Sequence, residues 1–106
     1  MFWTSNFLIN ATIAAGSLIK SFEYEINGSW KTASIISSSQ ESDGDAYHVY
    51  SCFVFKIPEN ISGTITGFRA VDSSGKVIGS KTENIVKSAG MAMVYKFKLR
   101  ICEEGE

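Results

Sequence analysis

A two-residue alternation near the C-terminus places the strongest constraint on how this chain can fold. Large apolar side chains stand at every second position: Met91, Met93, Tyr95, Phe97, Leu99 and Ile101. Between them lie Ala92, Val94, Lys96, Lys98, Arg100 and Cys102. Successive side chains of a β-strand point to opposite faces, so this pattern predicts a strand with one face in a core and the other, beyond Val94, in solvent.

Four further segments have the character of strands. Residues 21–26 alternate apolar and polar, and residues 46–57 are apolar on both faces, which predicts a central strand covered on both sides. Residues 64–71 and 76–81 are both β-like, and residues 72–75 between them fit a type I turn that ends in a left-handed glycine. Gly75 and Lys76 form a Gly-Lys pair of the kind found in phosphate-binding loops, but such a loop must open a helix. Because β-like segments flank this pair, it predicts a hairpin turn instead.

The first hairpin turns at Asn27-Gly28, a strong hairpin signal. A two-residue loop would pair Glu25 with Trp30 and set apolar positions against polar partners. A three-residue loop through Ser29 would pair Ile26 with Trp30 and bring the tryptophan onto the apolar face. We therefore expect the longer, bulged turn.

Three segments are expected to lack regular structure. Residues 37–45 contain no large apolar side chain and predict a loop. Residues 82–90 predict a polar link, and residues 103–106 an acidic, frayed tail.

Near the N-terminus, residues 4–15 repeat apolar side chains at helical spacing, with Thr4 or Ser5 as a cap and Gly16 at a left-handed end. Phe7 belongs to this apolar stripe, and Ile9 and Ile13 fall outside it. This predicts a short helix that is apolar on two sides. The stripe consists of Phe7, Leu8, Ala11, Ala14 and Ala15.

Length and composition set the class of protein. The chain has 106 residues, 44% of them hydrophobic, and a net charge of −1. We expect a mainly β fold: one antiparallel, β-sandwich-like domain of five or six strands with one short N-terminal helix, spanning residues 1–106. The near-neutral charge argues against a nucleic-acid partner. The N-terminal segment is too polar for a signal peptide or a membrane span, so we expect cytoplasmic synthesis or association with a virion, without membrane insertion.

Candidate chemistry is sparse. His48 and Cys52 are four residues apart on one predicted strand, about 13 Å of backbone, which is too far for a hydrogen-bonded pair. These residues and Cys102 lack the spacing of zinc ligands. Glu23 and Glu25 share one face of a predicted strand, and acidic side chains are common on the solvent-exposed face of a strand. We expect free thiols, with one disulfide as the alternative, and no catalytic residue, no metal and no cofactor.

Two groups of residues are the candidates for interaction. Aromatic and aliphatic side chains at the N-terminus predict a protein-binding surface, or else the completion of the core: Phe2, Trp3, Phe7, Ile9 and Ile13. Cations in the last strand predict either an anionic contact or, with greater weight, protection of a sheet edge from aggregation: Lys96, Lys98 and Arg100.

Three stretches resemble phage tail-fibre N-terminal domains. Residues 4–22 place a short helix and Gly16 before a strand. Residues 65–78 contain a strand, an Asp-x-x-Gly turn and the start of a second strand. Residues 87–90 lead into a final strand in which apolar and polar residues alternate. The resemblance implies a structural role in a virion or prophage, without catalytic residues. We therefore expect a non-enzymatic assembly module that binds a protein partner or itself. The alternative is an immunoglobulin-like adhesion domain that uses loops such as residues 37–45.

Overall fold

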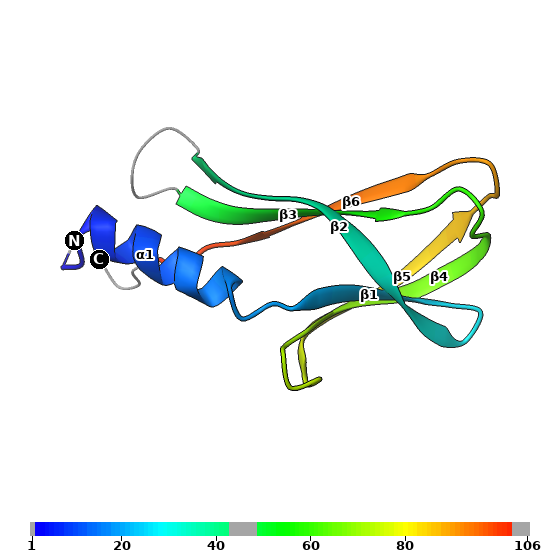
Figure 1. Cartoon of the computed structure of the whole chain (residues 1–106), viewed down its shortest axis with the longest axis horizontal. Helices are drawn as coiled ribbons and strands as arrows, with labels where there is room; N and C mark the ends of the chain where they lie inside the picture. Colours follow the sequence, from blue (N-terminus) through cyan, green and yellow to red (C-terminus); the bar gives the residue numbers. More distant parts are fainter. Residues whose placement is uncertain (1, 43–48, 103–106) are drawn as a thin grey trace.

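The computed structural model describes residues 2–42 and 49–102, which form one helix and six strands. In chain order the elements are α1 (Ser5–Gly16), β1 (Ser21–Ile26), β2 (Ser29–Ser42), β3 (Val49–Ile57), β4 (Gly63–Val71), β5 (Val77–Lys87) and β6 (Met93–Leu99). All paired strands are antiparallel, in the order β5-β4-β1-β2-β3-β6. The mainly β class with a short N-terminal helix is confirmed (Figure 1).

The sheet curls over itself, and β2 is the strand that makes this possible. Residues 29–33 of β2 pair with β1, and residues 34–42 pair with β3, with a register shift between Ile35 and Ser37 near the start of the second ladder. Figure 1 shows β2 running diagonally from one layer to the other. The strands therefore form one continuous curled sheet, in which β2 pairs with both β1 and β3.

The core lies inside the curl. Nine buried residues form one cluster: Phe22, Tyr24, Ile26, Ala33, Phe53, Phe55, Ile57, Ile65 and Phe68. The alternation is confirmed within β6, where Met93, Tyr95 and Phe97 pack against this cluster while Lys96 and Lys98 stay exposed. Met91 and Ile101, which were predicted on the same core face, are 70% and 39% exposed, because both lie beyond the ends of β6. β3 is buried on both faces as expected, with Phe55 on the inner face and Cys52, 0% exposed, on the outer face.

The first hairpin turns differently from our expectation. Ile26 pairs with Ser29 and Glu25 with Trp30, so the loop has two residues, with φ of 52° at Asn27 and 77° at Gly28. Left-handed conformations at both positions match the twist of the strands, and Asn-Gly adopts them at low cost.

Trp30 consequently lies on the outer face, where it contacts residues that the sequence did not predict as its neighbours. The Arg69 guanidinium lies 4.1 Å from its ring centre. A Cβ added to Gly67 would lie 3.3 Å from the indole, so this glycine lets the ring lie close to β4. These contacts cover Trp30 only in part, since it remains 36% exposed.

Two predicted irregular segments are strands. Residues 37–42 continue β2 and pair with β3, and residues 82–87 continue β5 and pair with β4. Both predictions were wrong because backbone pairing with an apolar neighbouring strand outweighs the weak preference of these polar residues for strand structure. Residues 43–48 and 103–106, which hold the rest of the predicted loop, the start of the predicted third strand, His48 and the acidic tail, lie outside the described residues.

The turn at residues 72–75 is confirmed. The Asp72 carboxylate accepts hydrogen bonds from the backbone N–H of Ser74 at 2.9 Å and of Lys76 at 3.0 Å, and Gly75 has a φ of 85°. The Ser74 hydroxyl also donates to this carboxylate and, together with the backbone donors, holds the Asp72 pKa below its ordinary value. The glycine and lysine of the sequence therefore close a hairpin.

Replacing Phe55 by alanine tests the position of the core. Phe55 is fully buried, so we expect the free energy of unfolding to fall by about 3–5 kcal/mol, measured by urea denaturation. The control is Val94→Thr at a position that is 57% exposed, where we expect a change within about 0.5 kcal/mol. Equal effects of the two substitutions would contradict the assignment of inner and outer faces.

Candidate functional site

Helix α1 is fastened to the end of the sheet by small residues. Its buried stripe consists of Leu8, Thr12 and Gly16. The Ser51 hydroxyl donates to the Thr12 carbonyl at 3.3 Å, and the Thr12 hydroxyl accepts from the backbone N–H of Ile101 at 3.1 Å. These contacts tie the helix to β3 and to the segment that follows β6.

The ends of α1 are only partly as predicted. Thr4 is the cap, and its hydroxyl accepts from the backbone N–H of Phe7 at 3.2 Å. Gly16, which we expected in a left-handed position, is instead helical, and Ser17 follows as the C-cap. A Cβ on Gly16 would lie 3.0 Å from the Ser51 hydroxyl and 3.3 Å from the Phe53 ring, so the glycine is required for close packing.

The other side of α1 carries large apolar side chains that point to solvent. We call this surface the helix patch: Phe2, Trp3, Phe7 and Ile13, which are 79%, 44%, 48% and 41% exposed. The Trp3 ring lies edge-on to Phe2 at 4.8 Å and stacks on Phe7 at 4.7 Å. Ile9 is half-buried. The two-sided helix is confirmed, and of the predicted stripe only Leu8 is buried, because Thr12 and Gly16 make the remaining close contacts with the sheet.

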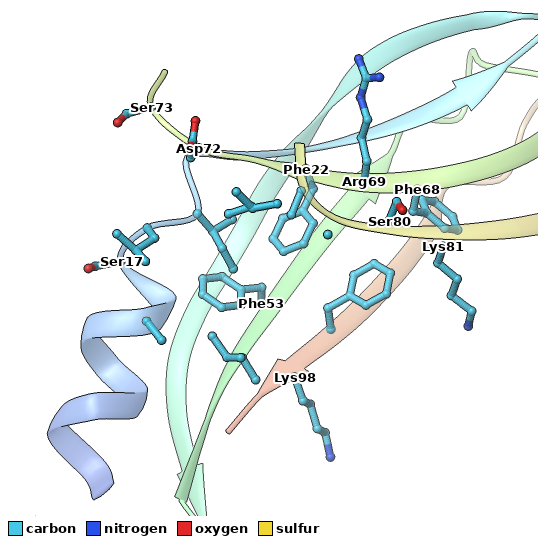
Figure 2. A pocket seen from close by; sticks show the side chains of 18 residues that line it. Ser17, Phe22, Phe53, Phe68, Arg69, Asp72, Ser73, Ser80, Lys81 and Lys98 are labelled. Atoms are coloured by element: carbon cyan, nitrogen blue, oxygen red, sulfur yellow. The ribbon is translucent and has the colours of Figure 1, made fainter. Parts of the chain in front are cut away.

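A half-open cavity of about 600 Å³ lies on the inner side of the curl, between the start of β5 and the end of β6. Phenylalanine rings from four strands line it: Phe22, Phe53, Phe68 and Phe97. Figure 2 shows Phe22 and Phe53 at its centre, Asp72 and Ser73 at one side, and Lys81 and Lys98 extending away from the rings. Such a mainly apolar lining suits an apolar group, and its charged members are Arg69, Asp72, Lys81 and Lys98.

The candidate acids on the outer face have structural partners. Glu23 forms an ion pair with the Arg69 guanidinium at 2.6 Å, and Glu25 accepts from the Thr66 hydroxyl at 2.7 Å. Each carboxylate thus helps hold β1 to β4.

The basic residues of the last strand lie along the outer face of β6, an edge strand of the sheet. Lys96, Lys98 and Arg100 are exposed, and the Lys98 ammonium lies 4.5 Å over the Tyr50 ring. At the edge of a sheet, such cations would hinder pairing with a strand of another chain.

Both thiols are free, and they differ in environment. Cys102 is exposed and Cys52 is buried. Burial, followed by the hydrogen bond to the neighbouring Glu41 carboxylate, raises the pKa of the Cys52 thiol. That same hydrogen bond is the main cause of a lowered pKa at Glu41. A buried thiol kept protonated is a poor nucleophile.

Among residues 2–42 and 49–102, acidic, histidine and cysteine side chains nowhere gather in a group of three that could hold a metal ion. Helix α1 is too short to cross a membrane, and the described part of the chain contains no helix that could. No family model matches the sequence, and no match was found among curated proteins or solved structures.

Thiol titration tests the environment of the two cysteines. With Ellman's reagent at neutral pH we expect the folded chain to release one equivalent quickly, from Cys102, and the second only in denaturant, because Cys52 is buried. The Cys102→Ser variant serves as the control and should not react while folded. Rapid reaction of this variant would contradict the burial of Cys52.

Proposed function

We propose that this chain is a non-enzymatic assembly module that acts through protein–protein contacts, including contacts with further copies of itself. The helix patch carries this proposal. Three aromatic rings, Phe2, Trp3 and Phe7, pack on one another in solvent at one end of the molecule. Clustered exposed apolar surface marks interaction sites, and aromatic residues are enriched at the centres of protein interfaces.

The shape of the molecule also supports assembly. Its radius of gyration is 15.8 Å and its extents are 48 × 29 × 22 Å. A compact domain of this length has a radius of gyration of about 13 Å. An elongated chain leaves more side chains at its surface, and a contact with another protein would bury part of that excess.

The proposal gives no side chain a catalytic role. Glu23 and Glu25 serve strand contacts, Cys52 is a buried, protonated thiol, and the cavity is lined mainly by apolar groups. Helix α1 packs on the sheet, which favours the assembly module over the immunoglobulin-like alternative.

The likeness to tail-fibre N-terminal domains makes a virion or prophage particle the expected setting. Gene neighbourhood is the direct test of this part. Tail or baseplate genes beside the coding sequence would support it, and a locus without any virion gene would contradict it.

Substitution in the helix patch tests the assembly role. We expect the mass of the native chain, measured by multi-angle light scattering, to rise with concentration. In a Trp3→Ser, Phe7→Ser double variant the association should weaken by a factor on the order of 30 or more, because aromatic anchors contribute strongly to interfaces.

The matched control is Asn6→Ser, Asn10→Ser, which changes two exposed polar positions of the same helix. It should associate as the native chain does, and circular dichroism would verify that both variants are folded. A native chain that stays strictly monomeric at high concentration would contradict self-assembly.

A further inference from the structure

The half-open cavity continues the apolar core toward the surface of the molecule. Two of the rings that line it, Phe22 and Phe53, belong to the core cluster, and Phe97 packs against that cluster. Two aliphatic side chains of the same lining are turned to solvent, since Leu18 is 66% exposed and Ile78 is 47% exposed. Covering this surface with an apolar group of another molecule would remove it from water and stabilise the contact.

The charged side chains of the lining have partners within the chain. Arg69 is ion-paired on the outer face, and Lys81 forms an ion pair with Glu83 at 2.8 Å. The Asp72 carboxylate accepts hydrogen bonds in its own turn, and the Lys98 ammonium lies over an aromatic ring. An uncharged occupant suits this lining best, because a buried charge is costly unless it gains a partner.

The N-terminal segment of the same protein has the required chemistry. Residues 2–19 contain no charged side chain. They carry the three rings of the helix patch, Phe2, Trp3 and Phe7, which pack on one another and stay exposed. An apolar cavity of about 150 Å³ holds one benzene molecule, so a cavity of about 600 Å³ has room for these three side chains.

The rings of the helix patch cannot enter the cavity of their own chain. The cavity borders the C-terminal end of α1, at Ala15 and Ser17, whereas Phe7 lies in the first turn of the helix. A helix rises about 1.5 Å per residue, so ~15 Å of helix separates Phe7 from Ser17. Figure 1 shows the N-terminal end of α1 at one extremity of the molecule, and Figure 2 shows Ser17 beside the cavity. Only the cavity of a second copy is therefore open to these rings.

We propose that the helix patch of one copy inserts into the cavity of the next, so that copies associate head to tail. This inference rests on the proposed assembly function and names the surface that the helix patch binds. The two surfaces are different, so each pair of copies still presents one unused patch and one unused cavity. Contacts of this kind extend into rows, or into rings where the rotation between copies closes.

Filling the cavity tests this contact. Gly79 lines the cavity beside Ala70, its φ lies outside the left-handed region, and a Cβ added there would lie 3.9 Å from the Ala70 Cβ. Gly79→Phe therefore places a ring in the cavity without displacing the core. We expect association, measured by multi-angle light scattering, to weaken by a factor on the order of 30 or more, as in the patch variant, because either change removes the same contact.

The matched control is Val86→Phe, which adds the same ring to the same strand at a position that is 77% exposed and outside the cavity lining. It should associate as the native chain does. A second cavity variant, Leu18→Ser, removes apolar area from the lining and should weaken association in the same direction. Circular dichroism verifies that all three variants are folded. Native association in both cavity variants would overturn the inference.

Mixing two variants distinguishes a head-to-tail contact from a symmetric one. The Gly79→Phe chain keeps its patch and lacks an open cavity, and the Trp3→Ser, Phe7→Ser chain keeps its cavity and lacks a patch. Each alone should stay monomeric where the native chain associates. The mixture should form a 1:1 heterodimer of near-native affinity that grows no further, because one patch and one cavity remain. If patches bound each other instead, the Gly79→Phe chain would associate alone, and the inference would be overturned.

The fluorescence of Trp3 gives an independent measurement. With Trp30→Phe in both chains of the mixture, Trp3 of the Gly79→Phe chain is the one remaining tryptophan. Its emission should move to shorter wavelength, and acrylamide should quench it less, when the patch-disabled chain is added, because the indole leaves water. A patch-disabled chain that also carries Gly79→Phe should leave the emission unchanged. Equal responses to the two added chains would overturn the inference.

These outcomes separate the inference from the proposed function. If the patch variant loses association and both cavity variants keep it, the helix patch binds another surface, and the assembly role stands without this contact. If the patch-disabled chain takes up the neutral dye Nile red in its cavity and forms no heterodimer in the mixture, the cavity belongs to a small apolar molecule and the inference fails. A native chain that stays monomeric contradicts self-assembly itself.

Discussion

Aromatic contacts between strands that share no hydrogen bonds hold the curl of this sheet closed. The Phe97 ring of β6 stacks on Phe22 of β1 at 5.6 Å, and Tyr95 of β6 meets Phe68 of β4 at 4.4 Å. β6 is paired only with β3, so these ring contacts and the buried area beneath them keep it over the opposite layer. Each such pair contributes about 0.5–1.5 kcal/mol beyond its area.

The same contacts define the surfaces that remain open. They bring β6 toward β4 and β1, but β5 and β6 stay separate, and the cavity opens between the start of one and the end of the other. A fully closed barrel would have no edges, whereas this sheet keeps two. The curl therefore explains both the position of the core and the two edges of the sheet formed by the described strands.

The sequence predicted features that depend on short-range chemistry. The alternation around Tyr95 and the turn after Asp72 were both found, because a two-residue period and an Asp-x-x-Gly turn are decided locally. The position of Trp30 was not, since it depends on Gly67 and Arg69, nearly forty residues away in the chain. Residues 37–42 and 82–87 were missed for the same reason: the strand that pairs with each lies elsewhere in the sequence.

Helix α1 shows why its outer surface bears on function. Helices of globular proteins commonly turn their large apolar side chains inward, but Phe7 is 48% exposed. Here Thr12 and Gly16 face β3, and Ser51 bonds to the Thr12 carbonyl, so the fold uses small residues where the helix meets the sheet. Trp3 and Phe7 thereby stay 44% and 48% exposed. Burial against another protein is the arrangement in which their apolar area would contribute most.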